Sequence, residues 1–115
     1  MLVPGGEYDR IPMQVGATGT GNGTPAFCTN LTGGAKTALT VQITGLNGDT
    51  ITFEATIDGT NWVAVQATNL TTGSIATTAT ANGLYRLTVL GLNQVRARVS
   101  TYGAGTIMVT GNASA

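Results

Sequence analysis

The ten residues 56–65, TIDGTNWVAV, bring together a carboxylate, polar side chains and the only Trp of the chain. Asp58 could act as an acid catalyst or a metal ligand, and Trp62 could stack on a sugar ring. A metal site needs several oxygen ligands, but the next acid, Glu54, is predicted to point outward from the preceding strand. Asp58-Gly59 between two alternating segments is typical of a hairpin turn, because Gly59 accepts a positive φ. We interpret the stretch as a hairpin corner with Trp62 as an apolar cap, and a glycan platform at Trp62 is the alternative.

The rest of the chain offers few residues that could act as a nucleophile or as a general acid or base. The sequence has no His, and its single Cys, Cys28, has no base nearby in the sequence. Hydrolysis by paired carboxylates needs two acids across a cleft, and Glu7 and Asp9 lie in a segment without a predicted core. We therefore predict that the chain is not an enzyme and uses no metal and no cofactor.

Three arginines lie on strands predicted in the C-terminal half of the chain. Arg96 and Arg98 share the outward face of VRARV, and Arg86 lies on the strand predicted just before it. Arg suits interfaces, because its planar guanidinium binds carboxylates in a bidentate manner and its stem packs. Two interpretations remain open for Arg96 and Arg98: a stripe that contacts a partner's carboxylates, or a solvated strand face.

The elements that must position these side chains are short strands. Apolar and polar residues alternate with a period of two, which is the pattern of half-buried strands, and Gly- and Asn-rich turns separate the runs. No amphipathic helix of ten residues can be drawn. Residues 38–115 therefore predict an all-β fold, an antiparallel β-sandwich that is jelly-roll-like, with additional strands around residues 71–80. The side chains predicted to face the core are Leu39, Val41, Ile43, Ile51, Phe53, Ala55, Ile57, Tyr85, Leu87, Val89, Val95, Ala97, Val99, Ile107 and Val109.

Residues 1–37 lack this alternation over most of their length. The run ATGTGNGT at 17–24 has no apolar face, so it cannot offset its ordering entropy by burial of its own. Two apolar islands, RIPMQV and AFC, interrupt the segment. We predict an extended N-terminal arm over 1–37 that docks one short strand on the sandwich domain 38–115 or on a neighbouring subunit; a disordered tail is the alternative. The residues predicted to contact a partner are Tyr8, Arg10, Ile11 and Met13.

Composition limits the classes of partner. Charged residues make up 9% of the chain, and five basic and five acidic residues give a formal net charge of zero. Nucleic acid and anionic membranes are disfavoured, because both bind clustered positive charge. No segment approaches the roughly 18 apolar residues of a membrane span, and the opening MLVPGGEYDR turns polar at once, so we predict no secretion signal. Near-zero charge gives little colloidal repulsion, which suits a subunit of an assembly better than a free monomer.

The order of several motifs resembles a known group of proteins. The segments are GDTITFEATIDGTNWVAV, then ANGLYRLTVLGLNQVRARVSTY, then GTIMVTGNASA. Over residues 39–115 the chain resembles small β-sandwich proteins encoded in the genomes of tailed bacteriophages. The resemblance implies a structural protein of the virion, and it implies no catalytic residues.

Within that resemblance, the leading hypothesis is a capsid decoration, or cement, protein. It would be made in the host cytoplasm, reside in the virion, form a homotrimer and bind the major capsid protein. The alternatives are a component of the phage tail, neck or fibre, and a carbohydrate-binding module that uses Trp62.

Overall fold

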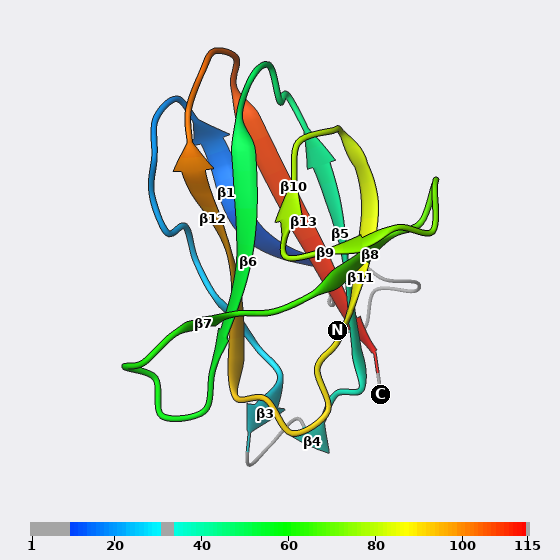
Figure 1. The fold of residues 1–115 in the computed structure, drawn as a ribbon. Coiled ribbons are helices and arrows are strands. Elements are labelled where there is room, and N and C mark those ends of the chain that lie inside the picture. Colours follow the sequence, from blue (N-terminus) through cyan, green and yellow to red (C-terminus); the bar gives the residue numbers. More distant parts are fainter. Residues whose placement is uncertain (1–9, 31–33, 115) are drawn as a thin grey trace, which may run out of the picture.

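The computed structural model describes residues 10–30 and 34–114, which form strands and turns and no helix (Figure 1). Two antiparallel sheets pack face to face, so the predicted β-sandwich is confirmed. The six-stranded sheet follows the order β1 (Arg10–Ala17), β13 (Ile107–Ser114), β5 (Ala38–Thr44), β11 (Gly83–Thr88), β8 (Ala67–Asn69) and β9 (Ile75–Ala76). The five-stranded sheet follows the order β10 (Thr78–Ala79), β6 (Thr50–Thr56), β12 (Gln94–Thr101) and β2 (Ala26–Phe27), and β7 (Val63–Ala64) also pairs with β6. A separate pair is formed by β3 (Thr29–Asn30) and β4 (Gly34–Ala35).

The chain crosses repeatedly between the two sheets, and this crossing builds the core. β5 and β6 are consecutive but lie in opposite sheets, and so do β11, β12 and β13 in turn. Alternation along each of these strands therefore turns one set of side chains toward the space between the sheets. Phe53 and Tyr85 meet there from opposite sheets with ring centroids 5.7 Å apart, and the Tyr85 hydroxyl donates to the Ala81 carbonyl at 2.7 Å.

The predicted core is correct except at the end of β6. Ile57, predicted to be buried, is 74% exposed, while its neighbour Thr56 is buried. β6 ends at Thr56, where the Thr56 hydroxyl accepts a hydrogen bond from the Gly59 N–H and donates one to Asp58. The turn thus begins one residue before the alternation would end, and it rotates Ile57 out to solvent.

The first described strand is part of the same sandwich. β1 pairs with β13 over most of its length, and Met13 is buried in the shared core together with Ala26 and Cys28. The buried Gln14 amide donates to the carbonyls of Ala97 at 2.8 Å and of Gly21 at 3.1 Å, which links β1 to β12 in the other sheet. Residues 10–28 therefore dock on their own sandwich.

One end of the sandwich is closed by a buried carboxylate. Asp49 lies in the β5–β6 turn and accepts hydrogen bonds from the backbone N–H groups of Asn47, Gly103 and Ala104. Burial opposes ionisation of Asp49, but these donors outweigh it and hold the pKa of the carboxyl below its ordinary value. The carboxylate joins the β5–β6 and β12–β13 turns, so it serves the fold at this end.

The described residues contain no helix that is long and apolar enough to cross a membrane.

The edge strand β1 is poorly suited to pair with another strand. It carries Pro12, and its register with β13 is broken between Pro12 and Gln14 and again before Ala17. Proline and bulges of this kind protect a sheet edge from further pairing.

Candidate functional site

The stretch TIDGTNWVAV forms the β6–β7 hairpin, and its acid is fully engaged within the turn. The Asp58 carboxylate accepts hydrogen bonds from the N–H groups of Asn61 and Thr60, each at 2.8 Å. The side chains of Asn61 and Thr56 also donate to it, at 2.8 and 3.0 Å. These donors hold the pKa of Asp58 far below its usual range, with the backbone N–H of Asn61 contributing most. Gly59 has a φ of 80°, as the turn requires. Asp58 therefore acts as the structural centre of the corner.

Trp62 lies on the outer face of the five-stranded sheet. Its ring is half-buried, and the Arg96 guanidinium carbon lies 4.1 Å from the ring centroid. This stacking arrangement is a cation–π contact. The geometry differs from the expected cap at the end of the sandwich, because the ring supports a cation on the flat of the sheet. One face of the indole is occupied by Arg96 and is closed to a sugar ring.

Glu54 completes the cluster on this face. It lies opposite Arg96 in the β6–β12 ladder and pairs with Arg96 Nε at 2.8 Å and with Arg98 at 3.2 Å. Only 12% of the Glu54 side chain is exposed. Burial opposes its ionisation, but hydrogen bonds and charge from Arg98 and Arg96 outweigh burial and lower its pKa. We call Trp62, Arg96, Glu54 and Arg98 the Glu54 cluster.

Arg86 does not extend the stripe of Arg96 and Arg98. The sequence places these arginines on consecutive strands, but β11 and β12 belong to opposite sheets. Arg86 is exposed on the outer face of the six-stranded sheet, where its Nε donates to the Thr40 hydroxyl at 3.1 Å. The predicted contact residue Arg10 lies on that same face, so the sandwich carries one arginine pair on each side.

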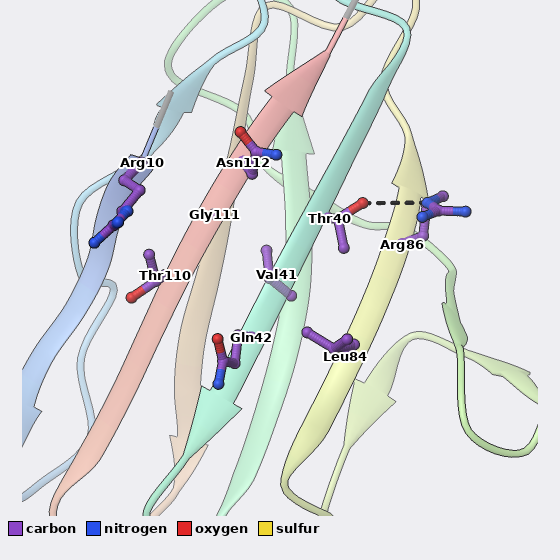
Figure 2. A pocket seen from close by; sticks show the side chains of 9 residues that line it. All are labelled: Arg10, Thr40, Val41, Gln42, Leu84, Arg86, Thr110, Gly111 and Asn112. Carbon is purple, nitrogen blue, oxygen red and sulfur yellow. Dashed lines mark hydrogen bonds between the residues drawn. The ribbon is translucent and has the colours of Figure 1, made fainter. Parts of the chain in front are cut away.

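Arg10 and Arg86 flank an open groove on the six-stranded sheet (Figure 2). The strand register places Arg10 opposite Asn112, Asn112 opposite Thr40, and Thr40 opposite Arg86. One row of side chains therefore runs from β1 across β13 and β5 to β11. The depression has a volume of about 430 Å³. Its lining residues, which we call the arginine groove, are Arg10, Thr40, Val41, Gln42, Leu84, Arg86, Thr110, Gly111 and Asn112.

The remaining predicted contact residues are dispersed. Tyr8 lies outside the described residues. Ile11 is half-buried against the core, and Met13 is 1% exposed. A buried Met13 thioether reaches no partner unless the sandwich rearranges. Cys28 is likewise buried, and burial raises the pKa of its thiol, which disfavours the reactive thiolate.

A second surface feature lies beside the β6–β7 hairpin. Ile57, Val63 and Leu90 are exposed by 74%, 67% and 63%. Val65 and Leu92 are half-buried. Both line the depression that contains Ile57 and Val63 and also the one that contains Leu90, so they connect the three exposed side chains. The depression at Ile57, Val63, Val65 and Leu92 measures about 420 Å³ and is mostly apolar. We call these five residues the apolar end. Sequence reasoning missed it, because it assigned Ile57 to the core.

Comparisons with known proteins identify the fold. No family model matches the chain, and no curated protein matches it. The solved structure of SPBc2 prophage-derived protein YomS is similar, with a TM-score of 0.79 and 23% identity over 90% of this chain and 89% of that one. PBSX exported protein XepA also has a TM-score of 0.79, with 12% identity over 98% of this chain and 44% of that one. The chain thus spans less than half the length of XepA, and both likenesses place it in the same β-sandwich fold.

Proposed function

We propose that this chain is a non-enzymatic structural protein of a bacteriophage virion, and specifically a capsid decoration protein. The likeness in fold to SPBc2 prophage-derived YomS and PBSX exported XepA supports an origin in a phage genome. The order of motifs over residues 39–115 supports the same origin. The main support for a structural role is the apolar end, because its exposed apolar side chains would be buried by contact with another protein.

The apolar end suits attachment to another protein. Soluble monomers rarely expose contiguous apolar surface without a function for it, and burial of such surface releases about 25 cal/mol per Å². Ile57, Val63 and Leu90 are among the most exposed large apolar side chains of the described residues. In this proposal the apolar end seats on the major capsid protein, and the rigid sandwich spans a junction between capsid subunits. A homo-oligomer, with a trimer expected from the sequence, multiplies the contacts made by each particle-bound unit.

The proposal requires no chemistry at the site. The three acids in the described part of the chain, Asp49, Glu54 and Asp58, are each held by several hydrogen-bond donors within the fold. Carboxylates engaged in this way favour their ionised form and stabilise turns and strands. They do not form a pair across a cleft of the kind that hydrolysis needs.

A substitution at the apolar end tests the proposal. Leu90→Asp places a charge in the surface to be buried, and we expect it to lower binding to undecorated capsids at least tenfold. Leu84→Asp is the matched control, since Leu84 is also exposed but lies in the arginine groove. Co-sedimentation with particles measures both variants, and circular dichroism verifies their fold. Equal binding by Leu90→Asp and the wild type would refute attachment through the apolar end.

The tail, neck or fibre remains the runner-up location within the virion. A protein at that location would also use a rigid sandwich and an apolar end. It would differ from a decoration protein in the number of copies in each particle. A carbohydrate-binding module that stacks a sugar on Trp62 is less well supported, because Arg96 already lies over the indole ring.

A further inference from the structure

We infer that the arginine groove on the six-stranded sheet binds an acidic oligosaccharide, a chain of sugar rings that carries carboxylate or phosphate groups. The arginine groove lies on the opposite side of the molecule from the Glu54 cluster. The inference also goes beyond the proposed function, since it assigns a ligand to residues outside the five that form the apolar end.

Arg10 and Arg86 are both available to a ligand. In the described part of the chain, Asp49 is bound by the turns, Asp58 by the hairpin and Glu54 by the arginines of the other sheet. No described acid is therefore left to pair with Arg10 or Arg86. Both side chains are exposed, and the guanidinium of Arg86 is fixed only through its Nε, by Thr40. Its two terminal nitrogens form the fork that binds a carboxylate or a phosphate in a bidentate manner.

The separation of Arg10 and Arg86 limits the size of the ligand that can contact both. Arg10 and Arg86 occupy one register row on β1 and β11, with β13 and β5 between them. Strands lie about 4.8 Å apart, so the two Cα atoms are separated by about 14 Å. Figure 2 shows the two arginines at opposite margins of the polar row. A small anion cannot contact both, whereas an extended chain with several acidic groups can.

Polar side chains cover the sheet between the two arginines. Asn112 and Thr40 fill the register row, and Thr110 and Gln42 oppose each other in the next outward row. Amide and hydroxyl side chains both donate and accept hydrogen bonds, which suits the hydroxyl groups of sugar rings. The backbone groups of β13 and β5 are already used, because each strand pairs on both sides. An added peptide strand therefore finds no free edge in the groove.

The lining also excludes the commonest alternatives. No aromatic side chain lines the groove, so it offers no stacking platform for a neutral sugar or a nucleobase. Two cations are too few for the multiple phosphate contacts that support binding to nucleic acid. An acidic glycan uses both features that are present, the flanking positive charge and the polar floor.

Titration with defined oligosaccharides tests the inference. Tetragalacturonate supplies carboxylates and pentamannose 6-phosphate supplies phosphate, and the fully methyl-esterified tetragalacturonate is the neutral control. Isothermal calorimetry on the whole chain should detect binding of at least one acidic probe. Arg10→Gln and Arg86→Gln should each weaken that binding about tenfold. Arg98→Gln removes the same charge from the opposite sheet and should leave it unchanged.

The two probes distinguish carboxylate from phosphate as the acidic group that the groove binds. Binding of tetragalacturonate assigns carboxylates and binding of the mannose phosphate assigns phosphate, and either supports the groove. Failure of both probes at millimolar concentration would overturn the inference. Equal binding of the neutral ester, or an equal loss in Arg98→Gln, would also overturn it. Arg86 also lines the depression at Leu90 and Leu92, so Arg10→Gln is the variant used to measure particle binding. Its particle binding should stay intact, which makes this result independent of the proposed attachment through the apolar end.

Discussion

The two outer faces of the sandwich each carry a pair of arginines, but they use them differently. On the five-stranded sheet, Arg96 and Arg98 share Glu54, and Trp62 lies beneath Arg96. On the six-stranded sheet, Arg10 and Arg86 flank a polar groove and pair with no described acid. On one face Glu54 therefore offsets one of the two arginine charges, and on the other face no described acid offsets either arginine.

This difference shows that the number of arginines on a strand does not identify a contact surface. The motif VRARV is the most conspicuous basic feature of the sequence, yet its charge is partly consumed by the neighbouring strand. Arg10 and Arg86 lie far apart in the sequence, and only the sheet register places them in one row on the same face. What distinguishes a structural arginine from an available one is whether an acid lies opposite it in the ladder, as for Arg96, or diagonally across it, as for Arg98.

The largest expected effect comes from removal of the acid in the Glu54 cluster. Glu54→Gln keeps the side-chain volume but leaves two arginines without their carboxylate, and we expect the free energy of unfolding to fall by about 2 kcal/mol. The control is Arg86→Gln on the other face, which should change stability by less than about 0.5 kcal/mol. Urea unfolding measures both variants. Equal losses would remove the distinction between the faces.

The loss of stability in Glu54→Gln should also depend on pH. The folded-state pKa of Glu54 lies below its ordinary value of 4.5, so its contribution is present above that pH and is lost as pH falls through the lower folded value. The stability difference between wild type and Glu54→Gln should therefore be full at pH 7 and shrink below about pH 4.5. Urea unfolding at pH 7, 5 and 3 gives this difference. A difference that stays constant across the series would contradict the ion-pair role.

A smaller effect is expected beneath the arginine groove. Gly111 faces the core from β13, and an added Cβ would lie 3.0 Å from Met13 Sδ and 3.2 Å from Leu39 Cδ1. Gly111→Ala should cost about 1 kcal/mol through overpacking, with the flexible Met13 absorbing part of the strain. Thermal unfolding measures the loss. A smaller cost of Gly111→Ala when it is measured in the Met13→Ala background would locate the clash at Met13.

The smallest effect concerns the indole under Arg96. Trp62→Leu keeps an apolar side chain on the sheet but removes the π face, and a double-mutant cycle with Arg96→Gln should give a coupling of about 0.5–1 kcal/mol. Equilibrium unfolding of the four proteins supplies the cycle. A coupling near zero would show that Trp62 and Arg96 are neighbours without mutual stabilisation.

The sequence predicted the sandwich because its core strands alternate cleanly. Burial of Val41 in β5 and of Ala97 in β12 follows from period two alone. Ile57 was assigned wrongly, because its burial depends on where the Asp58 turn begins, which is a matter of side-chain hydrogen bonding. The eight-residue strand β1 was expected only as a short docked strand, since its two register shifts disrupt the alternation.

The candidate site was less predictable than the fold, because its parts meet through long-range pairing. The hairpin at Asp58 is local, and the sequence identified it correctly as a corner. The arginine groove needs β1, β13, β5 and β11 side by side, an order that no local pattern encodes. Arg86 was grouped with Arg96 for the same reason, since consecutive strands of a sandwich need not share a sheet.

The most direct test of the virion assignment is a count of this chain in purified phage particles. Quantitative mass spectrometry of particles from the phage that encodes the chain gives its copy number relative to the major capsid protein. We predict a copy number on the scale of the capsid protein, as a decoration protein requires. A handful of copies would place the chain in the tail or neck, and its absence from the particles would contradict a structural role in the virion.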